Sequence, residues 1–222
     1  MPKDARATRE ALIRAGAHHF AAHGIDAART RDIVADAGQG NDSAITYHFR
    51  SRAGLLNAVL RAGITRMEPA RETALPGLHP RDLPAIVAAI VTPTADELRT
   101  AQGRDFLRIT AQLAGRAGIR DRHLPPLLHG TALQRQLELL HTACRTTLPE
   151  PLALERISLH IAYLTAALAD RATRTDSPLD HAAFTTDLTA QLTAALQAPT
   201  PRLPNHPPPN TVKTSPRGGA VR

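Results

Sequence analysis

Residues 30–49 constrain the fold most, because two short segments with apolar faces flank a polar turn. Thr30 is predicted to cap a helix over Arg31–Ala37, and Gly38, which tolerates positive φ, is predicted to end it. The polar run Gln39–Ser43 would then form the turn and the first residues of a second short helix. Two helices joined by a tight glycine-containing turn can place the second helix in the major groove of DNA. The stretch therefore predicts a helix-turn-helix.

Helices are also predicted on both sides of this motif, at residues 5–23 and 51–68. Together with its flanks, the motif resembles the N-terminal domain of the TetR family of bacterial transcriptional regulators. The turn is one residue longer than in many members, and an arginine stands at position 52 where the family usually has lysine. The residues that carry the resemblance are Ile13, Ala15, Phe20, Gly24, Thr30, Ile33, Ala37, Gly38, Tyr47, His48, Phe49, Ser51, Arg52, Leu55 and Leu56.

The composition favours an all-α fold. Apolar residues make up 42% of the 222, aromatic residues only 3%, and tryptophan is absent. Alanine and leucine dominate, which favours helix, and no convincing period-2 run indicates a strand. We expect an N-terminal three-helix DNA-binding domain at 1–50, and a larger helical regulatory and dimerisation domain at 51–198 whose first helix connects the two.

Prolines divide the larger region into predicted helices. The connecting helix is expected to end near Pro69, a loop to occupy 70–80, and Pro93 to bend or interrupt the next helix. Residues 199–222 contain seven prolines and four basic residues but no acidic or aromatic residue, so we expect a disordered basic tail. The remaining expected helices span 82–92, 104–116, 129–147, 152–174 and 178–197.

Positive charge is concentrated at the two ends of the chain. Residues 1–66 hold ten basic and six acidic residues, whereas residues 67–198 hold thirteen and fourteen. A basic N-terminal region is the expected footprint of a protein that contacts phosphates. We expect no membrane span, since no 18-residue apolar stretch stands out. The single cysteine, Cys144, and the absence of a signal-peptide pattern indicate a cytoplasmic protein.

Polar side chains around the second short helix are the candidate DNA contacts. Gln and Asn amides can pair with adenine, Asp can accept from cytosine, and the Thr methyl can meet a thymine methyl. Asp42 and Ser43 are also typical helix caps. We favour a cap for Asp42, because DNA phosphates would repel its carboxylate. The family positions add phosphate contacts by Thr30, Arg31, Tyr47, His48 and Arg52. The predicted set is Thr30, Arg31, Gln39, Gly40, Asn41, Asp42, Ser43, Thr46, Tyr47, His48 and Arg52.

No catalytic or cofactor motif stands out, and we expect a protein that is not an enzyme. His19 and His23 are spaced to share one face of a helix, but no carboxylate or cysteine stands at ligand spacing and no metal is predicted. His141 and Cys144 are interpreted as a polar lining and a buried thiol. Ile33, Val34, Ala37, Ile45 and Phe49 are expected in the core.

The resemblance implies a homodimer that binds double-stranded DNA and, most commonly, represses until a small molecule releases it. The near absence of charge in the apolar stripes favours an apolar or neutral ligand. A helical binding protein or enzyme without DNA binding, and a DNA-binding regulator gated by a protein partner, remain alternatives. The alternative for the candidate ligand-lining residues is that they simply belong to the core. They are Phe106, Ile109, Leu113, Leu137, His141 and Tyr163. Candidate dimer residues are Ile157, Ile161, Leu164, Ala166, Leu168, Phe184, Leu188 and Leu192.

Overall fold

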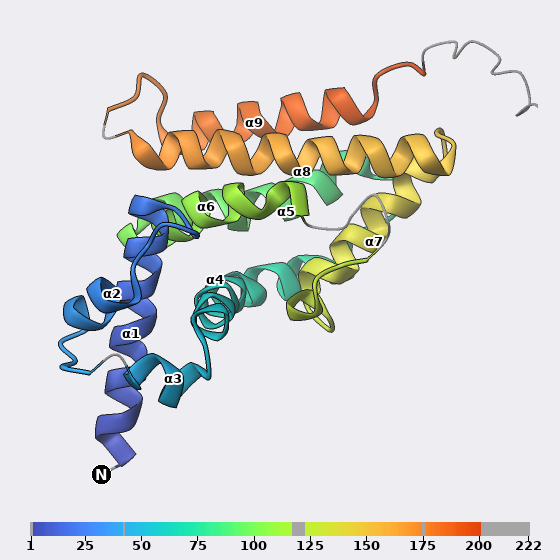
Figure 1. The fold of residues 1–222 in the computed structure, drawn as a ribbon. Helices are drawn as coiled ribbons and strands as arrows, with labels where there is room; N and C mark the ends of the chain where they lie inside the picture. The colour runs from blue at the N-terminus through green and yellow to red at the C-terminus, as the bar shows by residue number, and fades with distance from the viewer. Residues whose placement is uncertain (1, 42, 117–122, 175, 201–222) are drawn as a thin grey trace, which may run out of the picture.

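The chain folds into helices, and the part that the structure describes contains no strand (Figure 1). This computed structural model describes residues 2–41, 43–116, 123–174 and 176–200. The predicted disordered tail lies almost wholly outside them. The N-terminal helices are α1 (Pro2–His23), α2 (Thr30–Asp36) and α3 (Ser43–Phe49), and α4 (Arg52–Ala74) connects them to the rest. The all-α fold with an N-terminal helix-turn-helix is as the sequence predicts.

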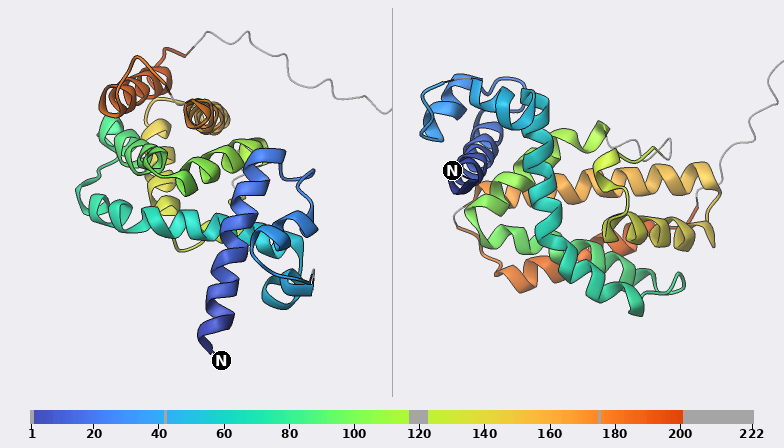
Figure 2. Two further views of the ribbon diagram at one scale, coloured as in Figure 1. Left: turned by 90° about the vertical axis from the view of Figure 1, so that its left-hand side faces the viewer. Right: turned by 90° about the horizontal axis from the view of Figure 1, so that it is seen from below.

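The larger region begins with α4 and continues through five long helices and short 3-10 turns. Its helices are α5 (Leu83–Asp96), α6 (Ala101–Leu113), α7 (Ala132–Arg145), α8 (Glu150–Thr173) and α9 (His181–Leu196), with 3-10 turns η1 (Leu75–Gly77), η2 (Glu97–Arg99), η3 (Ala114–Arg116) and η4 (Pro126–Leu128). α8 and α9 lie side by side on the face opposite α4, with α5, α6 and α7 between them (Figures 1 and 2).

Two prolines lie inside helices where the sequence predicted breaks. α4 continues past Pro69 to Ala74, and α5 continues past Pro93 to Asp96. A proline within a helix forfeits one backbone hydrogen bond, but here the following turns carry buried side chains, Arg71 in α4 and Thr94 in α5. The predicted ends at these prolines were wrong because tertiary packing outweighs the local cost.

The ends of α2 illustrate one correct and one wrong local prediction. Gly38 has a φ of 69° and ends the helix as predicted. Thr30, however, is the first residue of α2 and not its cap; Arg29 occupies the cap position without a side-chain hydrogen bond. The better capped start is that of α4, where Ser51 Oγ accepts a hydrogen bond of 3.0 Å from the Gly54 amide.

The N-terminal domain is held against the larger region by α4 and α6. α1 packs on both helices. α4 and α6 approach each other closely at Gly63, where a Cβ atom would lie only 2.2 Å from the Phe106 ring. Next to this contact, Arg66 of α4 forms an ion pair with the buried Glu97 of η2, with 3.2 Å from Nε to each carboxylate oxygen. A displacement of α6 would therefore also displace α4.

The predicted dimer stripes pack mostly inside their own subunit. Ile157, Leu164 and Leu168 of α8 and Leu188 and Leu192 of α9 are buried, while Ile161 and Phe184 are partly buried against the same core. Of the predicted dimer residues, Ala166 alone is exposed. The assignment was wrong for the buried leucines and isoleucines because the periodicity of an apolar stripe is the same whether it faces the core or a partner.

α8 is also more apolar than the sequence analysis recognised. By length and composition it could cross a membrane: an 18-residue window has a mean hydropathy of 1.3, although only 22% of that window is buried within this chain. The expectation that no such stretch exists was wrong. In the structure the helix packs against α6, α7 and α9 on one side and leaves Leu159 53% and Tyr163 48% exposed on its outer side.

Candidate nucleic-acid interface and regulatory cavity

The turn between α2 and α3 is fixed by local hydrogen bonds. The Gln39 amide donates to the Val34 carbonyl (2.9 Å), which closes the end of α2 around Gly38. The side-chain oxygen of Asn41 then accepts from the Ser43 amide (2.9 Å) at the start of α3. Asn41 thus supplies the capping interaction that the sequence analysis considered for Asp42 and Ser43. Asp42 itself lies outside the described residues.

Most of the predicted base-contacting residues gather on one outer face of this turn and helix. Ser43 and Thr46 are exposed, and Tyr47 is 81% exposed, the most exposed of the large hydrophobic side chains. A shallow hollow of about 560 Å³ lies between this face and the start of α1. It is lined by Ala5, Thr8, Gln39, Gly40, Asn41, Ser43, Ala44, Tyr47 and His48.

The opposite face of the motif anchors it to the domain core. Ile33, Val34, Ile45 and Phe49 are all buried, as predicted, and Ala37 is partly buried. Arg50 then turns the chain with a φ of 67° into α4. This backbone conformation is uncommon for a residue other than glycine. The second helix of the motif, α3, is therefore held at both ends. Its outer polar face is left accessible to a macromolecule such as DNA.

Arg52 does not face outward as the sequence analysis predicted. Its Nη2 donates to the backbone carbonyls of Ile25 and Ala28, the latter at 2.9 Å, and its guanidinium lies 5.1 Å from the centre of the Phe20 ring. The side chain thus connects the start of α4 to the loop between α1 and α2. With these bonds made, Arg52 is a residue of the domain framework, and a phosphate contact by its other N–H groups stays a prediction.

Among the other predicted phosphate contacts, Thr30 is partly buried and Arg31 is exposed. The Arg31 Nε lies 3.3 Å from a carboxylate oxygen of Asp32, both on the surface of α2. Such an exposed pair is weak, so it would not hold the arginine away from a phosphate. Nothing in the structure bears on whether these residues contact DNA, which remains a prediction.

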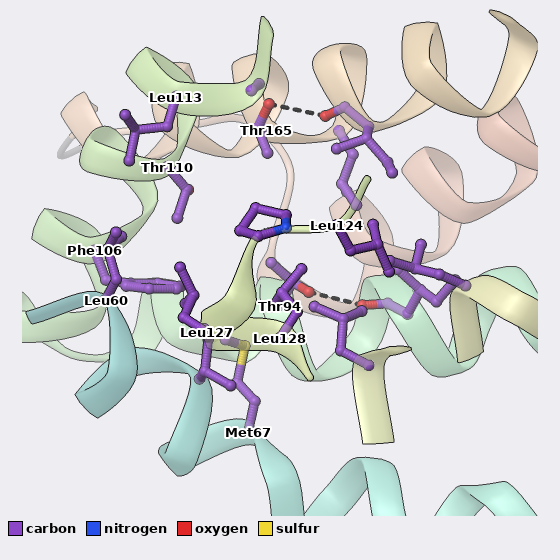
Figure 3. A pocket seen from close by; sticks show the side chains of 18 of the residues that line it. Leu60, Met67, Thr94, Phe106, Thr110, Leu113, Leu124, Leu127, Leu128 and Thr165 are labelled. Atoms are coloured by element: carbon purple, nitrogen blue, oxygen red, sulfur yellow. Dashed lines mark hydrogen bonds between the residues drawn. The ribbon is translucent and has the colours of Figure 1, made fainter. Parts of the chain in front are cut away.

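A cavity of about 370 Å³ lies within the larger region (Figure 3). Its walls come from α4, α5, α6, η4, α7 and α8, and most of its lining is apolar, including Leu60, Met67, Leu124, Leu127 and Leu128. The size falls within the range of roughly 300–1,000 Å³ that is typical of small-molecule sites. α4 and α6, which line this cavity, are also the helices on which α1 packs.

Three of the six predicted ligand-lining residues border the cavity: Phe106, Leu113 and Leu137. Ile109 is fully buried in the core but does not line the cavity. Tyr163 lies on the outer side of α8, where its hydroxyl donates to Gln191 (2.6 Å). His141 is not among the lining residues either, and lies 3.9 Å from Glu150. These three assignments are corrected, because helical spacing fixes a face but not what that face meets.

Arg71 is a lining residue that the sequence analysis missed. It is 2% exposed, and burial lowers the pKa of its guanidinium from its ordinary value to about 10. The group therefore still carries its charge at neutral pH. No sequence signal distinguishes it from the surface arginines of α4, since Pro69 was expected to end that helix before position 71.

A second missed residue, Gln112 of α6, joins the two domains. Its side-chain oxygen accepts from the Ile25 amide (2.8 Å), and its side-chain nitrogen donates to the Phe20 carbonyl (3.3 Å). The carbonyl of Ile25 accepts from Arg52 of α4. One peptide segment of the DNA-binding domain is thus bonded to both α6 and α4. We call the group formed by Gln112, Ile25 and Arg52 the interdomain junction.

His18 and His19 have carboxylate neighbours, and Cys144 is buried. His18 lies 3.7 Å from Asp105 of α6, whose pKa is raised by burial, and His19 lies 3.5 Å from Asp36 of α2. In the part of the chain that the structure describes, no three His, Cys, Asp or Glu residues group as a metal site would require. Cys144 is buried, which raises its thiol pKa to about 11 and keeps it protonated.

Comparison with known proteins agrees with this geometry. Residues 12–59 match the family described as bacterial regulatory proteins, tetR family. No curated protein matches the sequence. A candidate transcriptional regulator from Streptomyces coelicolor is 24% identical, with 86% of this chain and 96% of that chain covered and a TM-score of 0.50. An ArpA-like γ-butyrolactone receptor is 19% identical, with 86% and 98% covered and a TM-score of 0.50.

The fold and the exposed face of α3 define a helix-turn-helix transcriptional regulator that binds DNA. Residues 12–59 thus form a segment of the type found in bacterial regulatory proteins of the TetR family. The solved structures share its all-α architecture beyond that segment.

Replacing Arg52 by alanine should destabilise the N-terminal domain. The substitution removes donors to two carbonyls and the contact with Phe20, and hydrogen bonds from charged groups contribute about 1.5–3 kcal/mol. Denaturant titration should show this loss, and DNA affinity should fall equally for all sequences. Replacing the exposed Arg61 on α4 is the matched control. An unchanged unfolding free energy for Arg52→Ala, with weaker DNA binding, would restore the phosphate-contact role.

Proposed function

We propose that the protein is a repressor that binds a palindromic operator as a homodimer and is released by a small molecule in the cavity of the larger domain. The observation that carries this proposal is that α4 and α6 line the cavity and also hold the DNA-binding domain through the interdomain junction. We propose a DNA-binding domain at 1–50 and a ligand-binding and dimerisation domain at 51–198. We also propose that the protein acts on DNA in the cytoplasm.

Release would act through the separation of the two recognition helices. A dimer must fit two copies of α3 into successive major grooves, about 34–36 Å apart for motifs of this kind. A ligand that displaces α6 would move Gln112 and, with it, the segment around Ile25. Ligand and DNA then oppose each other by a coupling free energy of typically 1–3 kcal/mol. A solved structure with a similar fold is that of a γ-butyrolactone receptor, which is a precedent for a small-molecule ligand.

The proposed base contacts are Gln39, Asn41, Ser43 and Thr46, which are polar and lie on or beside the exposed face of α3, with Gly40, Asp42, Tyr47, His48, Thr30 and Arg31 around them. The Oδ1 atom of Asn41 is held by the Ser43 amide. Its amide nitrogen remains available as a donor, so base readout by Asn41 would use that group.

The proposed dimer surface is the outer side of α8 and α9. Leu159 and Tyr163 are large apolar side chains about half exposed there, and the small Ala166 continues the same side of α8 one turn on. Tyr163 is tied across to Gln191 of α9 by its hydroxyl, so the two helices present one continuous face. A second copy of this face would cover the apolar surface in a four-helix contact.

Selection of bound sequences from random DNA by the purified protein tests DNA recognition. We expect a palindromic site whose affinity falls steeply with salt, by about 0.9 log units per log unit of salt for each phosphate neutralised. Asn41→Ala should relax one position in each half-site, at a cost of roughly 1–3 kcal/mol. Arg145→Ala, on the exposed surface of α7, is the control. A selected motif that is unchanged in Asn41→Ala would show that Asn41 does not read a base.

Replacing Gln112 by alanine should loosen the interdomain junction. The two hydrogen bonds that reach Phe20 and Ile25 are lost, each worth about 1 kcal/mol. Hydrogen exchange measured by mass spectrometry should speed up in residues 24–29, and operator affinity should change several-fold without loss of helix content. Gln197→Ala, at the exposed end of α9, should leave both unchanged. Equal exchange in the two variants would remove Gln112 from the coupling route.

Replacing Ala166 by glutamate tests the dimer surface. A charge at an exposed position that faces a partner helix is costly to bury, so we expect a monomer with normal helix content and no operator binding. Light scattering and circular dichroism measure these properties. Ala70→Glu places the same change on the exposed surface of α4 and should stay dimeric. A dimeric Ala166→Glu protein would move the interface elsewhere.

A further inference from the structure

Among the described residues that line the cavity, Arg71 is the one that carries a charge. It comes from α4, two turns beyond Ile64 and one turn beyond Met67, and only 2% of its surface is exposed. An arginine side chain is normally kept out of such an environment unless its charge is paired. Its position against an otherwise apolar cavity therefore requires an explanation.

The guanidinium is only partly satisfied by the protein. Its Nη2 donates to the Thr94 hydroxyl (3.0 Å) and lies 3.5 Å from the Met67 sulfur. The Nε and Nη1 atoms have no hydrogen-bond partner among the described residues. An arginine carries five N–H donors and cannot accept, so the group has donor capacity to spare.

Neighbouring carboxylates do not take up this capacity. Glu68 and Glu97 lie close enough to favour the charged form of Arg71. However, Glu97 is bound by Arg66, and one oxygen of Glu68 accepts from the Ala132 amide (2.8 Å). No ion pair to Arg71 is present within the described ranges.

The other polar groups of the cavity are poor donors. The hydroxyls of Thr94, Thr110 and Thr165 each donate to a carbonyl of their own helix, at 2.7, 2.9 and 2.8 Å; Figure 3 shows all three side chains around the cavity. These hydroxyls therefore offer a ligand lone pairs and not protons. Arg71 is left as the principal donor within the cavity. Asn57 also lines the cavity, but its side chain is exposed.

We propose that the effector is a small, largely apolar molecule that carries a carboxylate, and that Arg71 binds this carboxylate. The inference rests on the proposed function and specifies its ligand. The carboxylate would accept from the guanidinium in a charge-assisted hydrogen bond, while the apolar body lies against side chains such as Phe106, Leu113 and Leu137. It replaces the neutral ligand that the sequence favoured, because that expectation was formed without Arg71.

Isothermal titration of the full chain with matched acids and alcohols tests the proposal. The probes are octanoate against 1-octanol, and 4-phenylbutyrate against 4-phenylbutanol. We expect each acid to bind at least about tenfold more tightly than its alcohol, as a hydrogen bond between charged groups implies. Equal affinity within both pairs, or no binding of either acid at millimolar concentration, would overturn the proposal. This comparison uses the unaltered chain and does not depend on how a variant folds.

Arg71→Met then assigns the preference to this side chain. The variant keeps the length and apolar character of the stem, and should bind each acid at least about tenfold more weakly while binding the alcohols no more weakly. Thr165→Val, across the same cavity, is the matched control and should keep the preference for the acid. Unchanged affinity of Arg71→Met for the acids, with helix content intact, would exclude Arg71 as the carboxylate site.

Operator binding in the presence of the probes separates this inference from the proposed function. An acid that binds at Arg71 and also releases the operator supports both. An acid that binds at Arg71 without release contradicts ligand-controlled repression and supports the carboxylate site. Release by the neutral alcohols alone supports ligand-controlled repression and overturns the carboxylate site.

Discussion

The backbone of Ile25 lies where α1, α4 and α6 meet, and the relation between the two domains depends on its two hydrogen bonds. Its amide is bound by Gln112 of α6, and its carbonyl by Arg52 of α4. Backbone groups inside a protein must be satisfied by some partner. Here the partners come from the regulatory side, so the DNA-binding domain cannot shift on α6 without breaking or remaking these bonds.

Both α4 and α6 form walls of the cavity, so a ligand there would contact the two helices that carry Arg52 and Gln112. The close approach of Gly63 to the Phe106 ring brings α4 and α6 into direct contact. Closely packed interiors transmit displacement instead of absorbing it. A cavity at this place is therefore suited to control the orientation of α3, and Arg71 places a fixed charge on α4 within that wall.

Local features of the chain could be predicted where neighbouring residues decide them. The turn at Gly38, the buried faces of α2 and α3 and the exposed polar side of α3 follow from periodicity and turn chemistry over a few residues. Arg52 and Arg71 could not be assigned in this way. Both are arginines of α4, yet one binds a loop 24–27 residues earlier in the chain and the other lines a cavity.

The sequence by itself determined the all-α class, the helix-turn-helix and the match of residues 12–59 to the TetR family, because those depend on short-range spacing that one chain segment carries complete. Only the tertiary structure decided which apolar stripe of α8 faces its own core, which residues line the cavity and which side chains join the domains. An apolar stripe or an arginine has the same sequence signature whatever it meets. Its partner is selected by the packing of helices that are far apart in the chain.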